Sequence, residues 1–385
     1  MKIKYIGVMM LFLCVSNICS QEIYQQTHIE LGDALNEGKS YLCQATTSIK
    51  LLPGFMYKPN KNNSLNLEIC RYSVFPPDEG YYGGASDKDD GVVGSLPSRF
   101  YTSNTGSAVY EIELKLPNAI GAMIPKLSFV YNSQSSNGIL GWAWNLSGLS
   151  SIERVGQTLY HDGKITSVDF ENDRFVIDGQ RLMLVDGVYG ANEAIYKTEV
   201  DNFDKIVSYA KSNKGPERFM VWKNDGTIWE YGATDDSRLE TQHDDDVILK
   251  WLLCKISDRN GNSIVFNYDK VPSEGMSYIN NIEYTLNEKK RVRPEYNIQF
   301  VYETKNSDVS LSYVCGNVVA SKRILKNVVV INNSTGKQLY DYSLEYNNPG
   351  YYGRNYFVHY RLKSVGLSIG DDKINPTRVI WNSEK

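Results

Sequence analysis

The chain has 385 residues, of which 42% are hydrophobic and 22% are charged, and its formal net charge is −4. This composition is typical of a globular protein and excludes a disordered chain. Binding to nucleic acid requires clustered lysine and arginine, but the basic residues form only one short cluster, Lys289-Lys290-Arg291 with Arg293. We therefore expect no nucleic-acid partner.

Residues 1–20 are predicted to be a cleaved secretory signal peptide. Lys2 and Lys4 precede an apolar run from Ile6 to Val15, which is short for a membrane span, and the small residue Ser20 precedes Gln21. Loss of the two lysines changes the formal net charge from −4 to −6. The sequence thus predicts an exported protein, extracellular or at the cell surface, with no transmembrane segment.

Four cysteines follow the predicted signal peptide. Cys43 and Cys70 bracket one short stretch and are a possible disulfide in an oxidising compartment. Cys254 and Cys315 lie in strand-like runs, where they would be small buried hydrophobic residues. The chain has no C-x-x-C motif and its four histidines are scattered, so we expect no metal site and no cofactor.

The next two segments differ in pattern. Residues 21–72 are predicted to form a small N-terminal β module, in which alternating strands around Ile49 and Leu67 flank a Pro53-Gly54 turn and a polar loop. Residues 73–105 are rich in proline, glycine and aspartate and have no sustained period. They predict a linker or a long surface loop.

From residue 106 to residue 385 the sequence predicts strand after strand and no amphipathic helix. Turn signals at Asp178-Gly179, Asn224-Asp225-Gly226 and Asn260-Gly261 lie between alternating apolar runs, as antiparallel hairpins require. The predicted fold class is all-β, and residues 106–385 are predicted to form its main β domain.

One segment of this domain stands out, because glycines and tryptophans interrupt its strands. The strand of Leu127 and Phe129 is followed by Trp142 and Trp144, which have the same parity and are predicted to lie on one face. The full signature comprises Tyr131, Asn132, Ser133, Gly138, Leu140, Gly141, Trp142, Trp144, Leu146, Gly148, Leu149 and Arg154.

This signature resembles the N-terminal domain shared by the Salmonella virulence plasmid B protein (SpvB) and the B components of Tc insecticidal toxin complexes. Ala143 stands where the family more often has glycine. The resemblance covers roughly Gly106 to Trp381, and Asp258 to Tyr268 resembles the tyrosine-aspartate repeats of Rhs proteins. It implies an antiparallel hairpin array that curls into part of an Rhs/Tc-like β shell. The signature residues would have a structural role in it.

The resemblance also implies a function. In the relatives such a domain helps to encapsulate or deliver an effector, which implies a secreted, non-enzymatic carrier whose protein partner is an Rhs/TcC-like or effector polypeptide. We predict no catalytic residues, because no Gly-x-Ser-x-Gly motif is present and no pair of acids stands out among 45. The alternative is a cell-surface adhesin or carbohydrate-binding β protein, and a secreted glycosidase is a weaker third reading.

Overall fold

A computed structural model describes residues 21–31, 40–52, 56–57, 65–69, 96–210, 215–243, 247–352 and 355–381. The chain forms two compact units, Met1–Gly91 and Val92–Lys385. The described residues are nearly all in strands, turns and loops, which confirms the predicted all-β class. Among them, no helix is long and apolar enough to cross a membrane.

The first unit contains a three-stranded parallel sheet. Its strands are β1 (Gln21–Leu31), β2 (Ser40–Leu51) and β3 (Leu65–Ile69), in the order β1-β2-β3. The two strands predicted from the sequence are β2 and β3, and they pair in parallel. The Pro53-Gly54 turn, Cys70 and the predicted signal peptide lie outside the described residues.

The second unit begins with a small antiparallel sheet of order β4-β5-β6-β9. Its strands are β4 (Ser98–Thr102), β5 (Ala108–Glu113), β6 (Ser128–Asn132) and β9 (Trp144–Ser147). β4 lies inside the range predicted to be a linker or long loop. All five of its residues are exposed, so the strand has no buried face and leaves no alternating pattern in the sequence.

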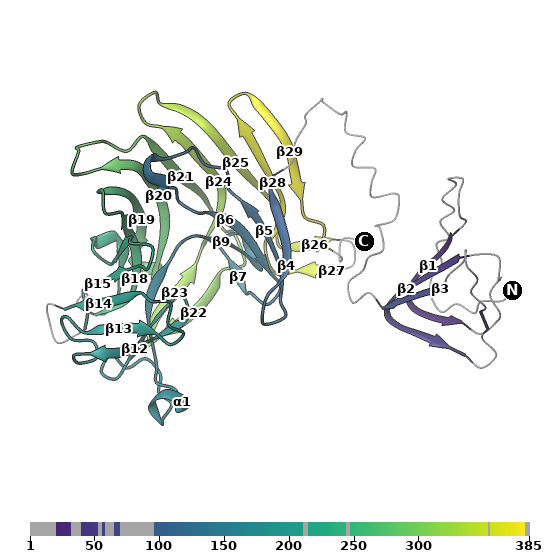
Figure 1. The fold of residues 1–385 in the computed structure, drawn as a ribbon, viewed down its shortest axis with the longest axis horizontal. Coiled ribbons are helices and arrows are strands. Elements are labelled where there is room, and N and C mark those ends of the chain that lie inside the picture. The colour runs from purple at the N-terminus through teal and green to yellow at the C-terminus, as the bar shows by residue number, and fades with distance from the viewer. Residues whose placement is uncertain are drawn as a thin grey trace. The chain divides into compact units, whose positions relative to one another are not determined.

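Eight further strands close into a ring, shown in blue-green to green in Figure 1. They are β10 (Ser151–Val155), β11 (Arg174–Ile177), β12 (Gln180–Asp186), β13 (Ile195–Thr198), β14 (Lys205–Tyr209), β15 (Arg218–Trp222), β16 (Ile228–Tyr231) and β18 (Ile248–Ser257). Consecutive strands pair as antiparallel neighbours, and β10 pairs with β18 to close the ring. Asp178-Gly179 connects β11 to β12, as the turn signal predicts.

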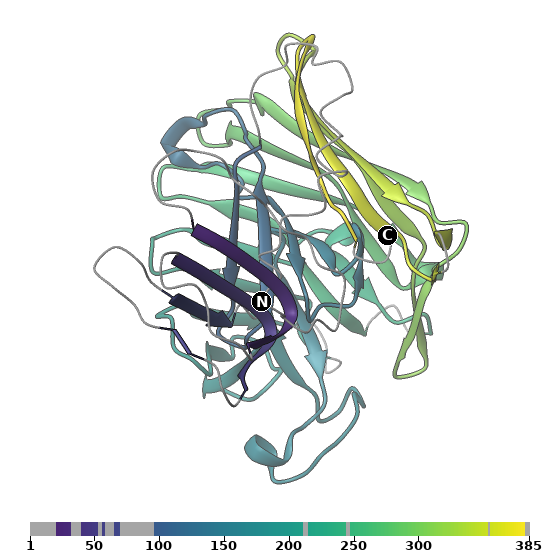
Figure 2. The ribbon, with the colours of Figure 1, turned by 90° about the vertical axis from the view of Figure 1, so that its right-hand side faces the viewer.

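β18 belongs both to the ring and to a long open sheet. Its residues Lys250–Leu252 pair with β10, and its residues Lys255–Ser257 pair with β19. From there the sheet continues through β19 (Asn262–Val271), β20 (Met276–Asn287), β21 (Tyr296–Thr304), β24 (Arg323–Asn332), β25 (Lys337–Asn347), β28 (Arg361–Ile369) and β29 (Asp372–Arg378). Figure 2 shows its last strands lying side by side as long curved ribbons.

Short elements complete the unit. They are β7 (Asn137–Gly138), β8 (Gly141–Trp142), β17 (Arg238–Glu240), β22 (Ser310–Val314), β23 (Asn317–Ser321), β26 (Gly350–Tyr352), β27 (Asn355–Phe357), α1 (Leu159–Asp162) and the 3-10 turns η2 (Ile120–Ala122), η3 (Asp235–Ser237) and η4 (Pro272–Glu274). The small sheet packs on the open sheet, where Phe129 of β6 contacts Tyr342 of β25 edge to face.

Four hairpins of the open sheet each contain the same type of hydrogen bond. In each, the two strands pair near the turn and diverge towards the open end, where an aromatic side chain of the second strand or just after it donates to a carbonyl oxygen of the first. The donor and acceptor pairs are Tyr268 Oη to Leu253 O (2.7 Å), Tyr302 Oη to Ile279 O (3.0 Å), Tyr346 Oη to Leu325 O (2.5 Å) and Trp381 Nε1 to Leu362 O (2.9 Å). We call these the aromatic bridges.

Candidate functional site

The signature segment does not form one continuous strand. Ala143 has a φ of 61°, in the left-handed region, so it separates β8 from β9. The expectation that Trp142 and Trp144 share one face is therefore wrong, because a left-handed residue between them breaks the period of two. The glycine that the family more often has here would adopt this φ without strain.

Trp144 fills the core of the small sheet. Its side chain is 2% exposed, and its ring contacts Tyr110 and Tyr131 at centroid distances of 6.2 and 5.7 Å. Tyr131 is opposite Trp144 in the β6–β9 ladder and also contacts Trp381, beyond β29. The rings thus join the small sheet to the far end of the open sheet.

Trp142 lies in β8, outside the small sheet. Its ring stacks on that of His359, with 4.4 Å between the centroids and 8° between the ring planes. His359 Nδ1 lies 2.6 Å from Asp308 Oδ1, which also accepts a hydrogen bond from Asn137 Nδ2 at 2.9 Å. The backbone N–H of Tyr360 donates to Asp308 Oδ2. One carboxylate therefore holds three chain segments together at the start of the signature.

Backbone contacts bind the signature to the open sheet. Gly141 has a φ of +85°, and a Cβ there would lie 2.5 Å from the carbonyl oxygen of Tyr360, just before β28. Trp142 N donates to that same oxygen, and Leu325 N, in β24, donates to Ile139 O. Glycine is required at 141 because a side chain would force the two backbones apart.

The remaining signature residues are also placed in structural contacts. Ser133 and Ala108 exchange two hydrogen bonds, Ala108 N to Ser133 Oγ and Ser133 N to Ala108 O. The side chain of Asn132 caps the following turn by accepting from Gln134 N. Buried or half-buried apolar positions are Leu140, Leu146 and Leu149, and Gly148 has a φ of +99°.

Arg154 lies inside the closed ring. Its side chain is 3% exposed, its Nη1 lies 3.3 Å from Asp173 Oδ2, and its Nε donates to Ile248 O at 2.6 Å. The guanidinium lies 5.6 Å from the ring centroid of Phe175 and 5.5 Å from that of Trp251. Burial lowers the pKa of Arg154. Both groups of this ion pair are strongly buried, and Arg154 also contacts backbone and aromatic groups of the ring strands.

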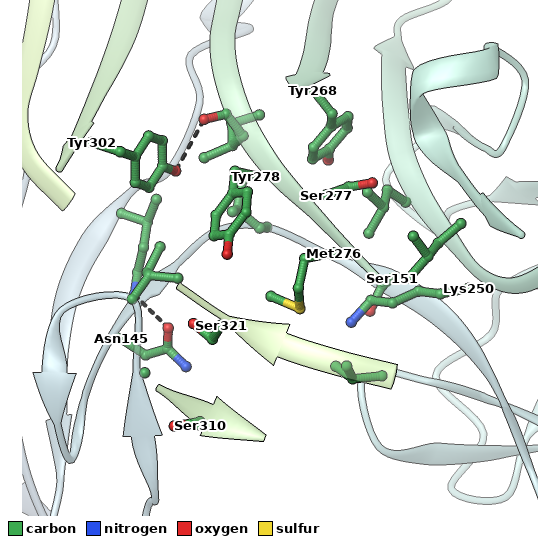
Figure 3. Close-up of a pocket in the computed structure, with 18 of the residues that line it drawn as sticks. Asn145, Ser151, Lys250, Tyr268, Met276, Ser277, Tyr278, Tyr302, Ser310 and Ser321 are labelled. Atoms are coloured by element: carbon green, nitrogen blue, oxygen red, sulfur yellow. Dashed lines mark hydrogen bonds between the residues drawn. The ribbon is translucent and has the colours of Figure 1, made fainter. Parts of the chain in front are cut away.

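A cavity of about 420 Å³ lies where the ring, the open sheet and the signature segment meet (Figure 3). β10 and β19 occupy successive parts of the same edge of β18, and the cavity lies beside the point where they separate. The segment from Tyr131 to Arg154, which carries the signature, contributes Asn137, Gly138, Ile139, Asn145, Leu146, Leu149, Ser150 and Ser151 to the wall. Sequence reasoning did not find this cavity, because the ring closure that forms it joins residues a hundred positions apart.

The lining of the cavity is apolar and uncharged polar, apart from one cation. Lys250 is that cation, and its Nζ lies 2.5 Å from Glu153 Oε1. Tyr278 Oη accepts from Lys322 N and donates to Glu274 Oε2, so this hydroxyl is already used. No carboxylate is among the lining residues that the structure describes. The wall therefore offers no acid pair for glycoside hydrolysis.

The other residues singled out from the sequence lie apart from this cavity. Cys254 is buried in β18, whereas Cys315 is exposed in the β22–β23 turn, so the expectation that both are buried is wrong for Cys315. Both are free thiols. In the described part of the chain, no three His, Cys, Asp or Glu side chains gather as metal ligands. The Cys43–Cys70 disulfide stays a prediction.

The fold of this chain is similar to part of the structure of Tc toxin components. The structure of TcdB2-TccC3 superposes with a TM-score of 0.61 at 13% identity over 75% of this chain, and the Photorhabdus luminescens Tc holotoxin pore with a TM-score of 0.58 at 15% identity over 75%. This chain spans only 17% and 16% of those chains. Among curated proteins, none matches this chain.

The family model described as Salmonella virulence plasmid 65kDa B protein matches residues 102–331, which is more than half of the chain. The chain belongs to this SpvB family. The N-terminal domain of the effector protein SpvB from Salmonella typhimurium strain LT2 superposes with a TM-score of 0.53 at 16% identity, over 67% of this chain and 98% of that domain. The family suggested by the signature is thereby confirmed.

Proposed function

We propose that this protein is an exported, non-enzymatic carrier that helps to enclose or deliver an effector polypeptide, with an Rhs/TcC-like or effector protein as its partner. The observation that carries the proposal is the fold: residues of the SpvB family match build a closed ring continued by a curved sheet, as in the solved Tc toxin components. In this proposal the curved sheet forms part of a wall around the partner polypeptide.

The side-chain chemistry of the site supports the same reading. Asp308 and the aromatic bridges use their polar groups to join chain segments. A second cavity, of about 370 Å³, is lined by Arg154, Asp173 and Glu171, but Arg154 and Asp173 are paired with each other. Charged groups at a catalytic site would instead be turned towards a substrate. Here the cavity at the signature is lined by aliphatic, hydroxyl and amide groups and by the paired Lys250.

The test is capture followed by protease protection. The tagged full chain is purified together with the products of neighbouring genes, and the captured polypeptide is identified by mass spectrometry and then exposed to protease, with an unrelated exported β protein as the capture control. We expect a captured polypeptide that is digested at least ten times more slowly than when free. Digestion at the free rate, or a chain that captures no polypeptide and is retained on a glycan array, would favour the adhesin alternative and contradict the carrier.

A further inference from the structure

The β22–β23 hairpin has a free edge. β22 pairs only with β23 among the strands that the structure describes. The two residues of the turn, Cys315 and Gly316, both have positive φ values, 46° and 79°. These values define a type I′ turn, which fixes the register of the two strands.

The register shows which backbone groups of β22 are unused by β23. In a two-residue hairpin the closing pair, here Val314 and Asn317, is hydrogen-bonded, and bonded and non-bonded pairs then alternate. Tyr313 and Leu311 therefore belong to non-bonded pairs, so their N–H and C=O groups point away from β23. The hydrogen bonds of Val318, which is opposite Tyr313, agree with this assignment of the outward groups.

Val318 turns its own backbone groups away from β22. Its N–H donates to Gln242 Oε1 at 3.0 Å, and its carbonyl oxygen accepts from Gln242 Nε2 at 3.3 Å. A glutamine side chain thus covers the outer edge of β23. The outer edge of β22 has no comparable cover among the hydrogen bonds of the described residues.

The side chains of β22 do not protect this edge either. Leu311 and Tyr313 are 58% and 65% exposed, and the strand SLSYV has no charge and no proline. The last strand of the open sheet, β29, has the sequence DKINPTR, with charges and a proline that discourage pairing with another chain. β22 is thus an edge without charge or proline, of the kind that can pair with a further strand.

We propose that β22 pairs with β22 of a second copy of this chain, antiparallel and with the twofold axis at Ser312. The strand is its own complement, because the two residues with outward backbone groups flank Ser312 symmetrically. Leu311 then lies opposite the partner's Tyr313, and each such pair exchanges two backbone hydrogen bonds. The same register places an aliphatic beside an aromatic side chain on the exposed face, a favourable cross-strand pair.

The first experiment measures the mass of the full chain in solution over a wide concentration range by sedimentation velocity. We expect a concentration-dependent dimer, and we expect Leu311→Pro to raise the dimerisation midpoint more than ten-fold. Proline removes an outward N–H that β23 does not use and is tolerated in edge strands. Leu311→Lys, which keeps the backbone intact, is a second disrupting variant, and Tyr160→Ser at an 87% exposed position is the control.

The second experiment tests the register. In a Cys315→Ser background, Ser312→Cys is expected to give a covalent dimer on mild oxidation, because the two Cβ atoms at the twofold axis lie within disulfide range. Tyr313→Cys in the same background is expected to give little. A monomer at every concentration, a dimer that Leu311→Pro and Leu311→Lys leave unchanged, or equal cross-linking of the two cysteine variants would overturn the proposal.

Discussion

The closed ring and the open sheet are built from similar hairpins, yet their interiors are stabilised differently. Inside the closed strand ring, the aromatic side chains of Phe175, Phe219 and Trp251 contact one another at centroid distances of 5.0 to 5.4 Å. They lie beside the buried ion pair Arg154–Asp173. Along the open sheet, the recurring feature is a neutral hydrogen bond, the aromatic bridge. The ring thus holds a charged pair in its interior, whereas the open sheet repeats a neutral hydrogen bond at successive hairpins.

The largest expected effect on stability comes from removing the buried cation Arg154 from the ring. Replacing Arg154 by alanine leaves Asp173 buried without its cation, and we expect the free energy of unfolding to fall by about 3–5 kcal/mol. Urea denaturation followed by tryptophan fluorescence measures this. Arg99→Ala, which removes a surface pair with Glu111, is the control and should cost far less. Equal losses of unfolding free energy in the two variants would contradict the expected difference between the buried and the surface ion pair.

The next effect concerns the attachment of the open sheet to the signature. Gly141→Ala adds a Cβ against the Tyr360 carbonyl in a left-handed backbone, and we expect a loss of about 3 kcal/mol in the free energy of unfolding. Gly336→Ala is the matched control, because Gly336 has a φ of +69° and open space around it. It should cost only about 1 kcal/mol, measured by the same urea titration. A similar cost at both positions would mean that close approach to Tyr360 does not matter.

Alkaline pH should weaken the open sheet through its buried tyrosines. Burial raises the pKa of Tyr342 to about 12, from about 10 in an unfolded chain. A group whose folded pKa is raised contributes stability that is complete below the unfolded pKa and is lost as pH rises through the folded one. We therefore expect Tyr342 to account for a loss of about 2 kcal/mol between pH 10 and pH 12.

Urea midpoints recorded at a series of pH values from 8 to 12 test this loss. Tyr342→Phe removes the titrating hydroxyl, so its stability should depend less on pH in this window than that of the native chain. Tyr160→Phe, which removes a hydroxyl at an exposed position, is the control. Identical pH dependence in all three proteins would rule out Tyr342 as a source.

The smallest effect belongs to a single aromatic bridge. Tyr302→Phe leaves the Ile279 carbonyl without its donor, and we expect a loss of about 1 kcal/mol in the free energy of unfolding. Tyr346→Phe should cost a similar amount, but the double variant should depart from the sum, because Tyr302 lies opposite Leu325, whose carbonyl accepts the Tyr346 hydrogen bond. Differential scanning calorimetry measures all three. A double variant equal to the sum would show that the two bridges act independently.

The sequence predicts much of the fold where local signals suffice. The turns at Asp178-Gly179, Asn224-Asp225-Gly226 and Asn260-Gly261 connect paired strands as predicted. Each contains a glycine with a positive φ, the conformation that such turns need and glycine adopts most easily. The signature was enough to identify the family, since its glycines are fixed by close approach of backbones rather than by composition.

The parts that were missed depend on long-range geometry. Closure of the ring by β10 and β18 joins distant residues, and no local pattern reports such pairing. The aromatic bridges occur at hairpins of unequal length, so their spacing along the chain is irregular and a repeat search fails. The cavity at the signature follows from the ring closure and was missed with it. Ala143 was missed as a break because alanine rarely adopts a left-handed conformation.

The aromatic bridges also bear on how such a protein changes during evolution. Each bridge is made within one hairpin, while neighbouring hairpins are joined by a full ladder of backbone hydrogen bonds, as between β21 and β24. A whole hairpin can then be gained or lost without redesign of the others, because each unit brings its own internal bond and a standard edge. Length along the open sheet is thus a variable that selection can adjust in steps of one hairpin.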